Sequence, residues 1–217
     1  MKIAFLGYGS MTHALGSRWA ANHDLFIGGR NPDKARACAE TLGHGARHGD
    51  APSAVSFGEV VVISVDNTAV FNIIDQAGGP DAFAGKIVVD INNPYNFDTG
   101  MTRPVAEGSL SQAIAAKLPG ARVVKAFNCC QAKVFEMDPP VFDGRTLVTM
   151  YAGDHPQANL QTAELIRDIG SEPLELGPLR HAQQLEAMAS VVIKFLMSGR
   201  DPYTVLNFIQ PEVRPIG

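Results

Sequence analysis

Two glycines separated by one residue, Gly7 and Gly9, follow an apolar segment at the start of the chain and precede a helical pattern. The full turn reads Gly7-Tyr8-Gly9-Ser10-Met11-Thr12. In such a turn the first glycine permits a tight bend, and the second lets the backbone approach a pyrophosphate at the helix N-terminus. We therefore predict that residues 7–11 bind a dinucleotide. The third position, usually a small residue that lets helix and strand pack closely, is Thr12 here.

The residue that would meet the adenosine ribose is an arginine. The apolar segment Leu25–Ile27 ends in Gly28-Gly29-Arg30-Asn31, and Lys34 follows one helical turn later. An NAD site usually carries a carboxylate here, which accepts a hydrogen bond from the ribose 2′-hydroxyl. Arginine instead meets a 2′-phosphate with its planar fork and stacks on adenine, while lysine adds a point charge. We predict an NADP(H) site that includes Gly29, Arg30, Asn31 and Lys34; the alternative is a solvated loop arginine.

Apolar segments alternate with helical patterns along the chain, and several of them are continuous runs of Val and Ile, as in strands buried on both faces. The predicted strands are Lys2–Leu6, Leu25–Ile27, Val60–Val65, Lys86–Ile91, Arg122–Phe127, Leu147–Tyr151 and Pro173–Leu176. The predicted helices are 11–22, 33–42, 67–77, 109–118, 156–169 and 179–198. This alternation predicts an α/β fold with a doubly wound, mostly parallel sheet of Rossmann type. We expect residues 1–178 to form the NADP-binding domain and residues 179–217 a C-terminal helix and extended tail.

Composition excludes several classes of partner. Of the 217 residues, 46% are hydrophobic and 18% charged, and the net charge is −4, which disfavours a nucleic-acid or anionic membrane surface. No basic leader or membrane-spanning apolar run is present, so we predict a cytoplasmic protein without membrane contact. The three cysteines are too few for a disulfide framework, and the six histidines lack metal-ligand spacing, so we predict no metal.

Several further segments resemble the NADPH:deazaflavin (coenzyme F420) oxidoreductase family, which also includes the reductase domains of membrane ferric reductases. The matching segments are Gly7 to Met11, Gly29-Arg30-Asn31, Val60–Val65, Asn92-Asn93-Pro94, Val124-Lys125-Ala126-Phe127-Asn128, Gly177-Pro178-Leu179 and Leu185-Glu186. The resemblance implies that Ser64 and Val65 line the dinucleotide, and that Asn92 to Pro94 and Ala126 to Asn128 flank the nicotinamide. It also implies a homodimer.

No residue is identified as catalytic; His181 and Tyr95 are weak candidates for a proton donor. Lys125 is expected to have a structural partner and Lys194 to be solvated. Adjacent cysteines rarely form a disulfide, so Cys129 and Cys130 are expected to pack in a pocket wall.

We expect the electron acceptor to be a small molecule. Three functions are compatible with the sequence. The leading one is hydride transfer from NADPH to a flavin-like or deazaflavin acceptor, whose ring absorbs negative charge without a proton donor. The alternatives are an NADPH-dependent reductase of a small carbonyl or imine, and a non-catalytic NADP(H) sensor. The lack of an obvious proton donor disfavours the carbonyl or imine reductase. Motifs on both sides of the nicotinamide favour an enzyme over a sensor.

The last predicted helix carries an apolar stripe that needs a partner surface. The stripe consists of Leu185, Met188, Val192, Phe195 and Leu196, and the tail beyond it contains Pro202, Pro211 and Pro215. We predict a homodimer in which residues 179–217 form much of the interface and complete the acceptor pocket. The alternative is that the helix folds back onto its own sheet.

Overall fold

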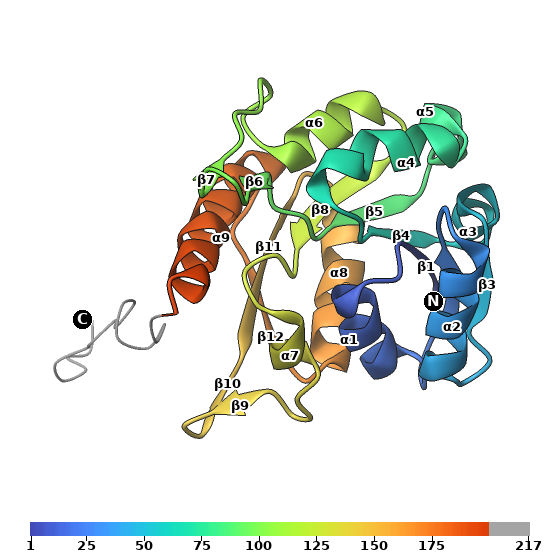
Figure 1. The fold of residues 1–217 in the computed structure, drawn as a ribbon, viewed down its shortest axis with the longest axis horizontal. Coiled ribbons are helices and arrows are strands. Elements are labelled where there is room, and N and C mark those ends of the chain that lie inside the picture. Colours follow the sequence, from blue (N-terminus) through green and yellow to red (C-terminus); the bar gives the residue numbers. More distant parts are fainter. Residues whose placement is uncertain (200–217) are drawn as a thin grey trace, which may run out of the picture.

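The continuous apolar runs form the centre of one eight-stranded sheet in a computed structural model that describes residues 1–199 (Figure 1). The strands lie in the order β12-β11-β8-β5-β4-β1-β2-β3. They are β1 (Lys2–Leu6), β2 (Asp24–Gly28), β3 (Arg47–Gly49), β4 (Val60–Ile63), β5 (Ile87–Asp90), β8 (Arg122–Ala126), β11 (Val148–Gly153) and β12 (Glu172–Glu175). All neighbouring strands pair in parallel except β11 and β8, which confirms the predicted doubly wound, mostly parallel fold.

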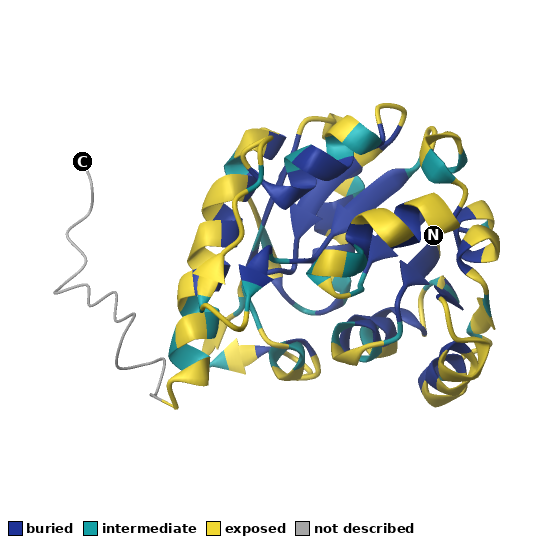
Figure 2. Ribbon diagram, turned by 45° about the horizontal axis from the view of Figure 1, so that its top comes forward, coloured by how far each residue is buried: buried dark blue, intermediate teal, exposed yellow. Residues whose placement is uncertain are grey.

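Helices cover both faces of the sheet, because successive side chains of a strand point to opposite sides. Ile3 and Phe5 of β1 pack with the face that α1, α2 and α8 cover, whereas Ala4 and Leu6 pack with the face under α3, α4 and α6. Figure 2 shows these buried strands between helices whose outer surfaces are exposed. The helices are α1 (Ser10–Trp19), α2 (Pro32–Leu42), α3 (Ala51–Phe57), α4 (Val70–Gln76), α5 (Gly79–Ala82), α6 (Leu110–Lys117), α7 (Ala132–Phe135), α8 (Pro156–Asp168) and α9 (Ala182–Met197).

The sheet changes winding direction at β1, which pairs with β2 on one side and β4 on the other. Connections after β1 and β4 therefore leave toward opposite faces of the sheet. In open α/β sheets a crevice for ligands forms at such a point, outside the carboxyl ends of the strands. The glycine turn after β1 lies at this place.

Several short elements were not predicted, because they carry no apolar pattern in the sequence. These are the edge strand β3, the helices α3, α5 and α7, and two small hairpins: β6 (Tyr95–Asn96) with β7 (Met101–Thr102), and β9 (Val141–Phe142) with β10 (Arg145–Thr146). Two predicted helices each begin with a short 3-10 turn, η1 (Asn67–Ala69) before α4 and η2 (Leu179–His181) before α9. The strand predicted as Val60–Val65 ends at Ile63, so Ser64 and Val65 belong to the loop that follows β4.

The apolar stripe predicted for the last helix is only partly buried. The buried side chains of α9 are Ala182, Leu185, Glu186, Ala189 and Ser190. Of the predicted stripe, Leu185 is buried, whereas Met188 is 37% exposed. The face of α9 that meets the sheet is lined mainly by small and polar side chains, including one carboxylate, so part of the predicted stripe stays exposed. The tail with Pro202, Pro211 and Pro215 lies outside the described residues.

Within residues 1–199 the structure contains no helix with both the length and the apolar character needed to cross a bilayer.

Candidate functional site

Gly7 and Gly9, the two glycines of the turn, have different structural roles. Gly7 has φ +123°, and a Cβ atom there would lie 1.9 Å from the backbone oxygen of Ser64. Only glycine fits such a position, because both the backbone angle and the contact exclude a side chain. Gly9 has φ −84°, and a Cβ atom there would meet nothing within 4 Å. The first glycine therefore serves the fold, whereas the second leaves open space outside the start of α1.

The start of α1 offers unoccupied hydrogen-bond donors to this space. Gly9 is the N-cap of the helix, and no side chain caps the first turn. Helix N-termini carry free N–H groups and a partial positive charge, which together favour an anion. The geometry of the turn thus suits a phosphate group.

Thr12, which departs from the usual small residue, is fully buried. Its hydroxyl donates to the Gly7 carbonyl oxygen at 3.1 Å and also bonds the Ser64 hydroxyl at 2.9 Å. Thr12 therefore ties the glycine turn to the end of β4. A smaller side chain would allow equal closeness but would leave the Gly7 carbonyl without this bond.

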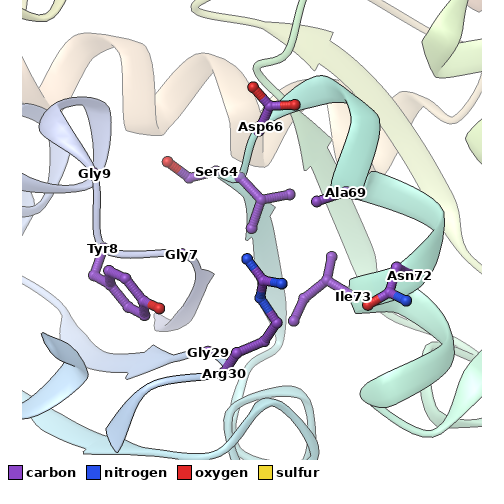
Figure 3. A pocket seen from close by; sticks show the side chains of 11 residues that line it. Gly7, Tyr8, Gly9, Gly29, Arg30, Ser64, Asp66, Ala69, Asn72 and Ile73 are labelled. Carbon is purple, nitrogen blue, oxygen red and sulfur yellow. The ribbon is translucent and has the colours of Figure 1, made fainter. Parts of the chain in front are cut away.

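A pocket of about 230 Å³, which we call the Arg30 pocket, opens beside the glycine turn (Figure 3). Its lining comes from the carboxyl ends of β1, β2 and β4 and from the following segments. The lining residues are Gly7, Tyr8, Gly9, Gly29, Arg30, Ser64, Val65, Asp66, Ala69, Asn72 and Ile73. A Cβ atom at Gly29 would lie 2.6 Å from the Tyr8 ring, so any larger residue here would shift that ring.

The Arg30 guanidinium extends into this pocket, toward Ile73 and the segment after β4 (Figure 3). Among residues 1–199 it forms no ion pair. The one carboxylate of the lining, Asp66, points away from Arg30 in the figure and accepts bonds from the Thr68 backbone N–H and hydroxyl. These bonds lower the pKa of Asp66, so it stays ionised. The pocket therefore holds a cation that is available to an anionic ligand.

Asn31 and Lys34 lie just outside the lining. The Asn31 side chain caps α2 by accepting a hydrogen bond from the Lys34 backbone N–H at 3.0 Å. Both side chains are exposed. Asn31 therefore has a local structural role. The structure brings seven of the predicted residues together in the Arg30 pocket: Gly7, Tyr8, Gly9, Gly29, Arg30, Ser64 and Val65.

A second pocket, of about 430 Å³, continues from the same helix start and has α9 as one wall. We call it the α9 pocket. It is lined by Ser10, Met11, Asn93, Asn128, Cys129, Cys130, Gln131, Ala132, Lys133, Ala189, Val192, Ile193 and Leu196. Gly9 lines the Arg30 pocket and the next residue, Ser10, lines the α9 pocket. An elongated ligand could therefore pass from one pocket to the other across the N-terminus of α1.

Two asparagines are locked together in the α9 pocket. The Asn93 side-chain amide donates to the Asn128 backbone oxygen at 2.8 Å, and the Asn128 amide donates back to Asn93 Oδ1 at 2.8 Å. The Asn128 amide also donates to the Leu185 backbone oxygen of α9 at 3.1 Å. Phe127, just before, has φ +57° although it is not glycine, and it packs edge-on against Trp19. A left-handed residue of this size persists only where its surroundings hold it, as at many functional sites.

Asn93 belongs to the predicted segment Asn92 to Pro94 and lines the α9 pocket. Asn92 itself is buried and donates from its amide to the Ile63 backbone oxygen and to Asp90. Ala126 is fully buried within β8. Pro94 lines two other pockets, one between α4 and α6 and one beside the start of α9. Of the two segments predicted to flank the nicotinamide, Asn93 and Asn128 therefore line the α9 pocket, and the other four residues do not.

The two weak candidates for a proton donor lie outside both pockets. His181, in η2, pairs its Nδ1 with Gln184 Oε1 at 3.2 Å, which is a local contact. Tyr95 is buried against Phe97, and no described residue bonds its hydroxyl. Lys194 is exposed and lies beside Gly100.

The cysteines of the α9 pocket are free thiols. Burial raises the pKa of Cys129 to about 12 and that of Cys130 to about 11, so both are protonated at neutral pH. Their place in a pocket wall agrees with the packing role expected from the sequence. Residues 1–199 contain no group of three or more His, Cys, Asp or Glu side chains suited to a metal ion.

Comparison with known proteins gives relatives of two kinds. The F420-dependent NADP reductase of Methanocaldococcus jannaschii is 30% identical over 230 residues, which cover 98% of this chain and 100% of that protein. Metalloreductase STEAP3 of Rattus norvegicus is 28% identical over 225 residues, 99% of this chain but only 43% of that protein. The chain thus spans less than half the length of the rat relative.

Two solved structures resemble this chain, one in sequence and fold and one in fold alone. A candidate F420-dependent NADP-reductase from Arthrobacter sp. FB24 superposes with a TM-score of 0.81 at 27% identity, covering 91% of this chain and 94% of that one. A reductive aminase from Aspergillus terreus in complex with NADPH shares the fold, with a TM-score of 0.67 at 18% identity, over 91% of this chain and 63% of that one. Residues 2–94 match the family described as NADP oxidoreductase, coenzyme F420-dependent. The chain therefore belongs to this family and is an NADP-dependent oxidoreductase.

Proposed function

We propose that this chain transfers a hydride from NADPH to a flavin-like or deazaflavin ring held in the α9 pocket. When bound, NADPH supplies the hydride, and the protein supplies binding, orientation and exclusion of water. The observation that carries the proposal is the lining of the α9 pocket. It joins the uncapped start of α1 and contains no carboxyl, imidazole or phenol group among the described residues.

The Arg30 pocket fits the adenosine half of NADPH. Arg30 would pair with the 2′-phosphate, and the free N–H groups at the start of α1 would hold the pyrophosphate over the open space at Gly9. Ser64 and Val65 would contact the ribose from the end of β4. Asn128, with Asn93, would then lie at the nicotinamide end.

The α9 pocket favours a ring acceptor over a carbonyl or imine. Reduction of a carbonyl or imine requires a proton donor near the reacting atom, whereas a flavin-like ring spreads the negative charge over its own atoms. Apart from the protonated thiols, the only ionisable lining residue is the exposed Lys133. The apolar wall formed by Val192, Ile193 and Leu196 suits a flat ring and keeps water away from it.

The names of the relatives are compatible with this class of acceptor. One is named for coenzyme F420 and the other for metal reduction. NADPH gives up a hydride, whereas a metal ion takes single electrons. Reduction of a metal therefore needs a carrier that first accepts the hydride, and a flavin-like ring can do this. The rat protein extends far beyond the part that matches this chain.

NADPH oxidation under anaerobic conditions tests the proposal. We expect turnover with at least one of coenzyme F420, FMN and riboflavin, and much slower turnover with small ketones and imines. Reduction of ketones or imines alone would support the second enzyme function. Tight NADPH binding without turnover of any acceptor would support a sensor.

We also propose that the chain forms a homodimer through α9. Apolar side chains are exposed on α9 and on the neighbouring β6–β7 hairpin, and we call them the α9 patch: Phe97, Met101, Met188, Val191 and Met197. Exposed apolar surface of this kind commonly pairs with a symmetric copy. Met188 and Val191 lie on the outer side of α9, whereas Met197 lines a pocket together with Phe97 of the hairpin.

Light scattering at micromolar concentration is expected to give twice the mass of one chain. Val191→Glu places a charge in the α9 patch and should produce monomers with reduced acceptor turnover and unchanged NADPH affinity. Leu160→Glu is the matched control, because Leu160 is also apolar and exposed, at 59% against 47% for Val191, but lies on α8. A monomeric wild-type protein would contradict the proposal.

A further inference from the structure

A cluster of three charged side chains is buried where α9 meets the sheet. Lys125 of β8 is 0% exposed, and its Nζ lies 2.9 Å from Asp90 Oδ2 and 2.9 Å from Glu186 Oε1. Its third hydrogen bond goes to the Asn92 backbone oxygen. All three donors of the ammonium are therefore used, and they connect β8, the end of β5 and α9.

Both carboxylates are fully supplied with donors. Asp90 accepts from the Ser111 hydroxyl at 2.6 Å and from the Asn92 backbone and amide. Glu186 accepts from the Leu110 and Ser111 backbone N–H groups, at 3.0 and 3.3 Å. These N–H groups belong to the first turn of α6, whose partial positive charge offsets the excess negative charge of the cluster. The oxygen atoms of both buried carboxyl groups are therefore satisfied by hydrogen-bond donors.

The Lys125 side chain is a charged ammonium group. Burial by itself lowers the pKa of Lys125, but attraction to Asp90 and Glu186 outweighs it and the net shift is upward. A buried ion cluster of this kind is costly to break, because removal of one partner leaves a buried charge without compensation.

Little else holds α9 in place. Its buried apolar side chains are Ala182, Leu185 and Ala189, and two of these are small. Its other side-chain hydrogen bonds to the sheet region are neutral: the Asn128 amide to the Leu185 backbone oxygen at 3.1 Å, the Cys129 thiol to the same oxygen at 3.6 Å, and the Thr102 hydroxyl to Ser190 at 2.8 Å. The charged contact of Glu186 is thus the strongest polar attachment of the helix among the described residues.

The same ammonium acts on the opposite wall of the α9 pocket. Lys125 holds the Asn92 carbonyl, and the next residue, Asn93, is bonded to Asn128. Asn93 and Asn128 line the pocket on the sheet side, and Ala189 and Val192 line it on the helix side.

We propose that Glu186 is a positioning residue, which acts through Lys125 and Asp90 to seat α9 as the wall of the α9 pocket. The inference rests on the proposed function only in taking the occupant of this pocket to be the electron acceptor. Glu186 does not line the α9 pocket, so its effect on turnover is exerted through the position of the helix.

Thiol alkylation tests the position of α9 without relying on activity. Cys129 Sγ lies 3.6 Å from the Leu185 backbone oxygen, so the helix covers it, whereas Cys38 is buried elsewhere, between α1 and α2. In Glu186→Gln, we expect iodoacetamide to modify Cys129 and Cys130 at least roughly ten-fold faster than in the wild type, because part of the lost ion-pair energy appears as local opening. Modification of Cys38, mapped by mass spectrometry, should keep its wild-type rate.

Kinetics give the second readout. The same variant should raise the KM for FMN or coenzyme F420 by a similar factor, while the NADPH Kd changes less than about two-fold. Gln183→Ala is the matched control, since Gln183 is an exposed residue of α9, and it should behave as wild type in both assays. If Glu186→Gln fails to fold, Glu186→Asp keeps the charge but draws the carboxylate one methylene away from Lys125, and it should loosen α9 to a smaller extent, again measured as selective alkylation of Cys129 and Cys130.

Unchanged rates for Cys129 and Cys130 in the folded variant would overturn the inference. Equal acceleration at all three cysteines would also overturn it, since that indicates loosening of the whole fold. If selective acceleration occurs but the wild-type protein reduces no ring acceptor, the positioning role stands and the proposed function fails.

Discussion

Replacement of Gly9 by valine is expected to abolish NADPH binding while leaving the fold intact. The side chain would occupy the open space outside α1, where a Cβ atom meets no protein atom within 4 Å but where we expect the pyrophosphate to lie. Affinity should fall at least about 100-fold, which corresponds to about 2.8 kcal/mol. Calorimetric titration with NADPH and NADH measures the loss, and the midpoint of thermal unfolding should remain close to that of the wild type.

Gly7→Ala is the matched comparison at the other glycine. Here φ is +123°, and the added Cβ would lie 1.9 Å from the Ser64 backbone oxygen, so the turn or β4 must move. Strain of this kind should lower the free energy of unfolding by about 2 kcal/mol or more. The two variants therefore separate a glycine required by the ligand from one required by the fold. Normal NADPH binding by Gly9→Val would show that the dinucleotide lies elsewhere.

The wild-type protein is expected to bind NADPH at least about ten-fold more tightly than NADH, a difference of about 1.4 kcal/mol. Arg30 extends into its pocket without an ion-pair partner among the described residues, so a 2′-phosphate would gain a charge-assisted, bidentate contact. Arg30→Ala should remove most of this preference and leave NADH affinity nearly unchanged. Stability should also be unchanged, because Arg30 is exposed.

Lys34→Ala provides the control for Arg30. Lys34 is a nearby exposed cation that lies outside the lining of the Arg30 pocket, so its loss should weaken NADPH binding much less. Equal affinities of the wild-type protein for NADPH and NADH would refute the assignment. A larger effect at Lys34 than at Arg30 would mean that the 2′-phosphate lies over the start of α2.

The sequence by itself determined the features that depend on neighbouring residues. Continuous apolar runs such as Val60–Ile63 indicated strands buried on both faces, and their alternation with helical patterns indicated the parallel sheet. The glycine turn and Arg30 could be read because a strand end followed by a helix start leaves a dinucleotide few ways to bind. These signals are local, since each is carried by a few consecutive residues whose backbone preferences and chemistry suffice.

Tertiary structure alone decided which polar side chains meet. Lys125 could be expected to have a partner, but Asp90 and Glu186 lie 35 and 61 residues away, and only the packing of β5, β8 and α9 identifies them. Thr12 likewise proved compatible with the glycine turn through Ser64, 52 residues away. Which residues of the α9 stripe are buried also depends on the surface that the helix meets, since Leu185 is buried whereas Met188 is exposed. Local patterns specify elements, whereas partners across the core depend on the arrangement of all elements together.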